Sequence, residues 1–249
     1  MKKIFIPLTA LFLSATLFAQ KDSASSSKLG GLFKKANSIL NSGKTTSGSL
    51  STDEIITGLK EALSLGAQKS GEKLSAADGF FKDAVVKILM PPEAVKVESK
   101  LRMLGMGKLV DNAILSMNRA AEDASKSAAP IFIDAIKKMT VQDALGILKG
   151  TDTAATAYLK TTTSPQLIAA FKPVIEASLD KVNATKYWED VFTNYNKVSF
   201  TKVDTDINSY VTTRALNGIF YYVAEEEKKI RTNPAERVSD ILKKVFGSK

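Results

Sequence analysis

Helix signals follow one another along almost the whole chain after residue 50, and this succession constrains the fold more than any other feature. Ser51 followed by Glu54 forms a capping box, in which each side chain accepts a hydrogen bond from the other residue's amide. Apolar and small residues then recur at helical spacing as far as Leu74. Gly66 and Ser70 lie within this apolar arc, which predicts that another helix crosses closely there.

Capping residues and prolines divide the rest of the chain into helices. Pro173 should kink or divide the helix that contains it, because proline has no amide hydrogen. The other predicted helix starts are Pro130, Thr140 with Asp143, Ser164–Pro165, Asp206 or Asn208, and Asn233–Pro234. The pattern predicts an all-α fold: a single irregular multi-helix domain that spans residues 51–249.

One run resembles a strand, "AVVKILMPPE" at residues 84–93, and two prolines close it. No second strand is evident to pair with it. We therefore expect an extended connector between helices and not part of a sheet.

The N-terminus has the three regions of a signal peptide. Lys2 and Lys3 precede an uncharged apolar run, and small Ala19 precedes Gln20. We expect residues 1–19 to be cleaved after Ala19, and the product to be periplasmic or secreted. Residues 20–50 are rich in Ser, Lys and Gly and predict a flexible tether with a possible short helix. No later stretch has the length and apolarity of a membrane span, so no stable membrane insertion is expected.

The chain contains neither cysteine nor histidine, and this excludes several chemistries. Disulfides, structural zinc sites and Ser-His-Asp or Cys-His catalysis all need one of these residues. The 35 basic and 26 acidic residues are spread along the chain, without the basic stripe and interleaved aromatics of a nucleic-acid-binding protein. The excess of positive charge favours only a weak attraction to anionic envelope surfaces.

Asp204, Asp206 and Asn208 alternate like the first ligands of an EF-hand calcium loop. The sixth position, where the loop needs glycine, is Ser209, and the twelfth, where it needs a bidentate glutamate, is Ala215. A helix start requires only one capping residue, Asp or Asn, whereas a calcium site requires the full set of ligands. We therefore predict no metal and no other cofactor.

Asn118, Arg119 and Glu122 lie close together at the edge of an apolar helix face. They could hold a polar ligand, or they could join this helix to its neighbour.

An aromatic stripe at helical spacing offers a second candidate site. It could line a pocket for an apolar ligand, or it could be ordinary core. The stripe consists of Tyr187, Trp188, Val191, Phe192 and Tyr195.

Glu226 falls near the centre of an apolar helix face, one turn after Tyr222. A carboxylate on a core face is costly unless it is paired. Its partner must be Arg, Lys, a hydroxyl or backbone amides, and we expect its side chain to be buried against a basic partner, with Arg119, Arg231 or Arg237 preferred. Tyr222 and Glu226 are also candidate binding residues.

Three segments together resemble a family of exported bacterial proteins known only as a domain of unknown function. They are "MNRAAEDA" at 117–124, "ILKGTDTAATAYLKTTT" at 147–163 and "YVTTRALNGIFYYVAEEEKKIRTNPAERVSDILKKVFG" at 210–247, the last being the most specific. The resemblance covers nearly everything after Ser51. It implies an exported helical protein and supplies no activity, cofactor or catalytic residue.

The leading hypothesis is a non-enzymatic binding protein of the cell envelope that takes an apolar or amphipathic small ligand. One alternative is a hydrolase of envelope glycans that uses two carboxylates, Glu226 with Glu122 or Asp206. Another is a structural partner of a second envelope protein.

Overall fold

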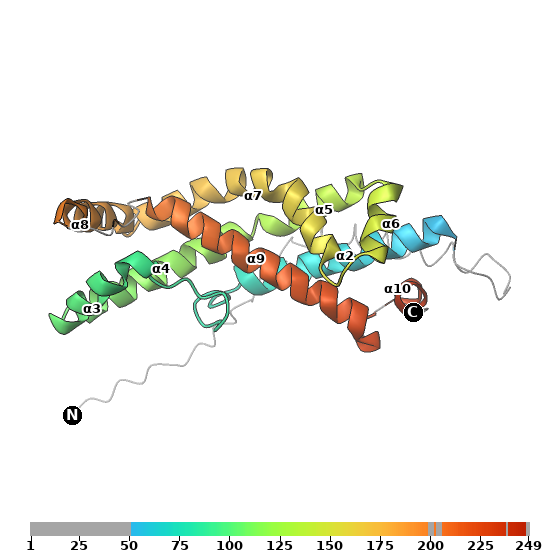
Figure 1. Ribbon diagram of the computed structural model, residues 1–249, viewed down its shortest axis with the longest axis horizontal. Coiled ribbons are helices and arrows are strands. Elements are labelled where there is room, and N and C mark those ends of the chain that lie inside the picture. Colours follow the sequence, from blue (N-terminus) through green and yellow to red (C-terminus); the bar gives the residue numbers. More distant parts are fainter. Residues whose placement is uncertain (1–50, 199–201, 203–205, 238, 248–249) are drawn as a thin grey trace, which may run out of the picture. The chain divides into compact units, whose positions relative to one another are not determined.

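The computed structural model describes residues 51–198, 202, 206–237 and 239–247, and within them every regular element is helical (Figure 1). The four long helices are α2 (Thr52–Ser75), α4 (Gly107–Ser125), α7 (Ala154–Asp180) and α9 (Ile207–Thr232). The shorter ones are α3 (Val95–Met103), α5 (Ala128–Lys138), α6 (Val141–Lys149), α8 (Ala184–Val198) and α10 (Asp240–Gly247), with 3₁₀ turns η1 (Pro92–Ala94) and η2 (Pro234–Glu236). The prediction of a single all-α domain is confirmed. None of these helices has the length and apolarity needed to cross a bilayer.

Local capping signals mark the starts of α2, α6 and α9 as predicted. The Glu54 amide donates to Ser51 Oγ at 3.2 Å and the Ser51 amide donates to Glu54 at 2.8 Å, so the capping box forms. Thr140 and Asp143 repeat this arrangement at the start of α6. Asp206 caps α9 by accepting from the Ser209 amide at 2.9 Å. Asp204 lies outside the described residues.

The predicted helix start at Ser164–Pro165 is wrong, because α7 runs through it without a break. The Ser164 hydroxyl donates back to the Lys160 carbonyl at 2.6 Å instead of capping a new helix. Pro173 also lies inside α7 and does not divide it. Prolines in a helix interior cost about 3 kcal/mol or more, so tertiary packing must offset them. The buried residues of α7 include Leu167, Phe171 and Ile175.

The four long helices form the core. The α7 helix packs on both α4 and α9, and α2 packs on α9 and α5 (Figure 1). A Cβ built on Gly66 would lie 3.3 Å from the Glu226 Cβ, so α2 and α9 cross closely at the predicted glycine. Ser70 is buried one turn later and donates to the Gly66 carbonyl at 2.7 Å. The predicted close crossing is confirmed.

The segment between α2 and η1 is an irregular connector, as predicted, and contains no strand. It nevertheless contributes to the core, since Phe80 and Ile88 are fully buried. Near the C-terminus, Asn233 accepts a hydrogen bond from the Ala235 amide. This predicted cap and proline begin only the turn η2, because the last helix, α10, starts later, at Asp240.

Candidate functional site

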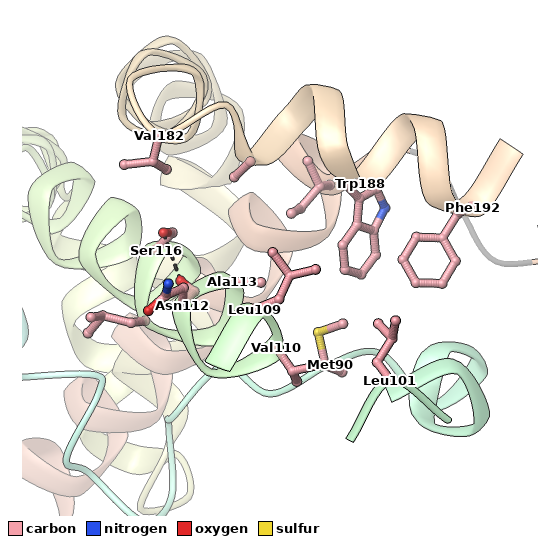
Figure 2. A pocket seen from close by; sticks show the side chains of 13 residues that line it. Met90, Leu101, Leu109, Val110, Asn112, Ala113, Ser116, Val182, Trp188 and Phe192 are labelled. Carbon is pink, nitrogen blue, oxygen red and sulfur yellow. Dashed lines mark hydrogen bonds between the residues drawn. The ribbon is translucent and has the colours of Figure 1, made fainter. Parts of the chain in front are cut away.

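An apolar pocket of about 440 Å³ lies between α4 and α8. Figure 2 shows Trp188 and Phe192 pointing from α8 toward side chains of α4, α3 and the connector. The residues that line the pocket are Met90, Leu101, Leu109, Val110, Asn112, Ala113, Leu115, Ser116, Val182, Ala184, Trp188, Phe192 and Ile207. None of these side chains carries a charge, so the pocket suits an apolar guest.

The α8 wall of the pocket is aromatic and buried. The ring centroids of Trp188 and Phe192 are 4.4 Å apart with planes tilted by 45°, which is a favourable aromatic contact. Two other parts of the lining are less covered, since Leu109 on α4 is 43% exposed and Val182, in the turn between α7 and α8, is 52% exposed. The pocket therefore opens to solvent past these two side chains.

Polar groups enter the lining at one place on α4. The Ser116 hydroxyl donates to the Asn112 carbonyl at 2.9 Å, one turn earlier (Figure 2). The Asn112 side chain is exposed, so its amide is available at the pocket edge. The site thus combines an apolar interior with a small neutral polar group, as an amphipathic ligand requires.

The predicted binding residues do not all lie in this pocket. Trp188 lines it. The side chain of Tyr195, like that of Tyr187, lies outside the described part of the structure. Tyr222 and Glu226 lie on α9 and are not among the lining residues.

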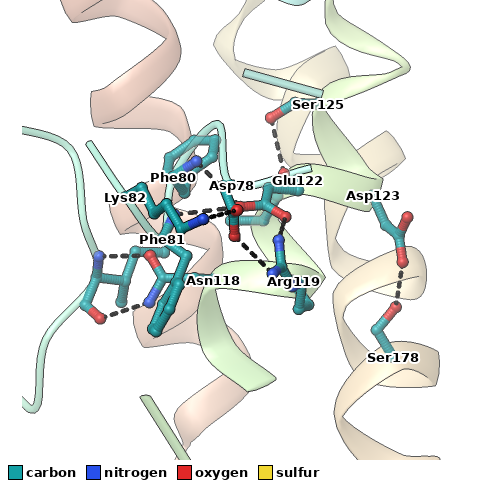
Figure 3. Close-up of polar contacts among 12 residues, drawn as sticks. Asp78, Phe80, Phe81, Lys82, Asn118, Arg119, Glu122, Asp123, Ser125 and Ser178 are labelled. Atoms are coloured by element: carbon teal, nitrogen blue, oxygen red, sulfur yellow. Dashed lines mark hydrogen bonds and ion pairs between the residues drawn. The ribbon is translucent and has the colours of Figure 1, made fainter. Parts of the chain in front are cut away.

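Asn118 binds the backbone of the connector (Figure 3). Its side-chain oxygen accepts from the Ile88 amide at 2.8 Å, and its side-chain nitrogen donates to the Ile88 carbonyl at 2.8 Å. One buried amide thereby satisfies both backbone groups of a buried connector residue, as a neighbouring strand would.

Glu122 and Arg119 bind the same connector nearer its start (Figure 3). The amides of Phe80 and Phe81 each donate to Glu122 at 3.1 Å. Arg119 bridges Glu122 and Asp78, with both N–O distances 2.6 Å. The hydrogen bonds that Arg119 donates to Glu122 and to Asp78 raise the pKa of Arg119. These contacts favour the structural alternative for the Asn118, Arg119 and Glu122 cluster.

Tyr222 also binds the connector. Its hydroxyl donates to Asp83, and Lys73 pairs with the same carboxylate at 3.3 Å. Burial raises the pKa of Asp83, but hydrogen bonds from Tyr222, Val85, Val86 and Lys73 outweigh it and leave this pKa below its usual value. Asp83 is thus held ionised at the meeting point of α2, α9 and the connector.

Glu226 is buried, as its position on the helix predicts. It has a basic partner, as expected, but the preference for arginine is wrong: Lys229 lies at 2.6 Å and Lys69 at 3.8 Å from its carboxylate. The arginines have other partners. Arg119 pairs with Glu122, Arg231 pairs with Glu227, and Arg237 donates to the carbonyls of Ile230 and Arg231. Arg231 pairs with Glu227 and not with Glu226 because residues four apart lie on the same face of a helix, whereas residues five apart do not.

Sequence reasoning missed Glu227, which is the more strongly bound carboxylate. It accepts from the amides of Ala155 and Thr156 at 3.0 and 2.9 Å and from the Thr156 hydroxyl at 2.8 Å. Arg231 donates to it through two nitrogens, at 3.1 and 2.8 Å. Glu227 therefore caps the start of α7 from another helix. The i,i+4 pair Glu227 and Arg231 is the only local signal of this role.

Each of the three acids proposed for hydrolysis makes a contact that holds the fold together. Glu122 binds the connector, Asp206 caps α9, and Glu226 pairs with lysines. None of the three lines the apolar pocket. Two-carboxylate hydrolysis needs both acids to face one substrate cleft. The contacts therefore favour structural roles for these acids.

A family model of proteins of unknown function, DUF4197, matches residues 49–247. No curated protein and no solved structure matches the chain. The match covers the whole helical domain and agrees with the resemblance carried by its C-terminal segment. The chain belongs to the DUF4197 family.

Proposed function

We propose that this protein is a binding protein of the cell envelope that takes an apolar or amphipathic small molecule into the pocket between α4 and α8. The supporting observation is the preformed apolar pocket against Trp188. Its volume of about 440 Å³ falls in the range of roughly 300–1,000 Å³ that is usual for small-molecule sites. A core of the same composition without a ligand role would be filled by its own side chains.

The lining defines the class of ligand. Its uncharged walls suit an alkyl chain or a similar apolar body, with each buried methylene contributing about 0.8 kcal/mol. Asn112 and Ser116 offer hydrogen-bonding groups to a small polar head. An ionic head would remain outside, past Leu109 and Val182, where the pocket opens.

Fluorescence tests this proposal directly, because Trp188 is the only tryptophan in the chain. The purified protein is titrated with the neutral apolar dye N-phenyl-1-naphthylamine while energy transfer from Trp188 is recorded. We expect saturable transfer, and competition by neutral single-chain amphiphiles that strengthens with chain length.

A matched pair of variants assigns the binding to the pocket. Ala113→Leu places three more carbons in the pocket, whereas Ala169→Leu makes the same change at an exposed position of α7. We expect Ala113→Leu to weaken dye binding by about tenfold or more and Ala169→Leu to leave it unchanged. Equal dye binding by both variants, or no saturable transfer in the parent, contradicts the proposal.

Export is a separate part of the proposal and rests on the sequence of residues 1–19. We expect the mature chain to begin at Gln20 and to fractionate with the periplasm or the medium. N-terminal sequencing of protein purified from its own host checks this. An intact Met1 to Ala19 segment in that material contradicts export through a cleaved signal peptide.

A further inference from the structure

The turn between α3 and α4 exposes large apolar side chains. Met103 is 78% exposed, Leu104 is 74% exposed and Met106 is 45% exposed. Gly105, at φ +79°, lies among them in this turn. We refer to residues 103–106 as the apolar tip. Contiguous exposed apolar side chains of this kind mark an interaction site.

Lysines flank the apolar tip in the sequence on both sides. Lys96 and Lys100 on α3 and Lys108 on α4 are all exposed. The only acids between residues 95 and 111 are Glu98 and Asp111, and both pair with Arg102, at 2.9 and 2.8 Å. The three lysines therefore have no acid partner within residues 95–111, and their charge favours an anionic surface.

The apolar tip also adjoins the mouth of the pocket. Leu101 precedes it and Leu109 follows it, and both line the pocket. Whatever the tip contacts is therefore brought next to the pocket opening.

We propose that the apolar tip docks on an anionic lipid surface, with Met103, Leu104 and Met106 entering the interface and the three lysines contacting lipid headgroups. Apolar side chains flanked by basic ones are the pattern of interfacial membrane binding. A protein partner fits the tip less well, because three side chains on a convex turn are few for an interface of about 800 Å² per partner.

This docking gives the pocket a ligand source. A lipid or lipid fragment leaving the membrane at the tip reaches the pocket past Leu109. That second step rests on the proposed function, whereas docking depends on the tip alone.

Co-sedimentation of the mature protein with lipid vesicles tests the docking. The vesicles are phosphatidylcholine alone or phosphatidylcholine with about one third phosphatidylglycerol. We expect binding only to the anionic vesicles, and binding that falls as salt is added. No binding to anionic vesicles at low salt overturns the proposal.

Two double variants separate the apolar and electrostatic contributions. We expect Met103→Ser with Leu104→Ser, and likewise Lys100→Glu with Lys108→Glu, to lower vesicle binding by about tenfold or more. The control is Ile168→Ser with Lys172→Glu, at exposed positions of α7, which should bind as the parent does. Tip variants that bind like this control overturn the proposal.

Two further measurements distinguish docking from ligand binding and from self-association. Ala113→Leu should keep vesicle binding and lose dye binding, while the tip variants should do the reverse. Sedimentation velocity without lipid should give one mass for the parent and for the Met103→Ser, Leu104→Ser variant. A parent oligomer that dissociates in this variant makes the tip a protein interface and overturns the lipid proposal.

Discussion

Two regions of this domain use the same helical pattern differently. In the crossing region, where α9 packs on α2, on the connector and on the start of α7, backbones approach closely. A Cβ built on Gly218 would lie 2.6 Å from a Phe80 ring carbon. In the pocket region, where α3, the start of α4 and α8 meet, a Cβ on Gly107 would have its nearest neighbour at 3.6 Å. The crossing region is tightly packed, whereas the pocket region contains a cavity.

The polar groups follow the same division. Two buried carboxylates bind segments of the crossing region that are distant in sequence: Glu122, on α4, binds the connector, and Glu227, on α9, binds the start of α7. Among the residues that the structure describes, none that lines the pocket carries a charged side chain. The difference indicates that stability resides in the crossing region, so that the pocket region can keep exposed apolar surface without loss of the fold.

The largest expected effect is that of Glu227→Ala in the crossing region. The change leaves the Arg231 side chain, which is 7% exposed, without its carboxylate, and it removes the acceptor for three donors at the start of α7. We expect the free energy of unfolding to fall by about 3–5 kcal/mol. Urea denaturation followed by circular dichroism measures it.

A control for this prediction lies one residue earlier. Glu226 pairs with Lys229 and Lys69, whose side chains are 50% and 40% exposed and can reach water when the acid is removed. Glu226→Ala should therefore cost well under half as much as Glu227→Ala. Equal losses would show that Glu227 has no special role in the crossing region.

The second largest effect is expected for Gly218→Ala, which tests the packing of the crossing region without changing any charge. Gly218→Ala places a methyl group against the buried Phe80 ring, at a distance that no relaxed contact allows. We expect a loss of about 1–3 kcal/mol from overpacking, although alanine favours helices more than glycine does. Gly146→Ala is the matched control, since a Cβ there meets nothing within 4 Å, and it should be stabilising. A stabilising Gly218→Ala would contradict the close approach.

A smaller, pH-dependent effect is expected for Tyr222→Phe. The pKa of Asp83 is lowered in the folded protein, so its contribution to stability is fully present above its unfolded pKa and is lost as pH falls through the folded value. Removing the Tyr222 hydroxyl should cost about 1 kcal/mol at neutral pH. The difference from the parent should begin to shrink below about pH 4, where aspartate in the unfolded chain becomes protonated, and should be lost as pH falls through the lower pKa of Asp83 in the folded protein. Thermal unfolding from pH 7 to pH 3 measures this, and a constant difference would contradict it.

Sequence predicted the features that depend on neighbours within a few residues. The Ser51 and Thr140 caps are set by i,i+3 partners, and the connector by its prolines. The start predicted at Ser164 failed because local signals do not report the packing that keeps α7 continuous. The helical wheel placed Glu226 in the interior because burial follows periodicity, but its partner depends on which cation can reach it.

The functional region is where distant residues matter most. Glu227 was missed because its donors at Ala155 and Thr156 lie 72 and 71 residues away. The aromatic stripe predicted Trp188 as a pocket residue, yet the facing wall comes from α4 and from Met90 of the connector. The sequence of one helix predicts which of its side chains face an apolar environment. Whether the space beside them is filled depends on how the helices pack.

The smallest expected effect is at the pocket mouth, and it tests the comparison most directly. Leu109→Ala and Leu159→Ala remove the same atoms, but Leu109 is 43% exposed beside the pocket and Leu159 is fully buried in α7. Leu159→Ala leaves a cavity in packed core and should cost about 2–5 kcal/mol. Leu109→Ala widens a space that is already open and should cost about 0.5 kcal/mol or less. Equal losses in urea denaturation would mean that the pocket is closed by its own side chains in solution, and the binding proposal would lose its basis together with the comparison.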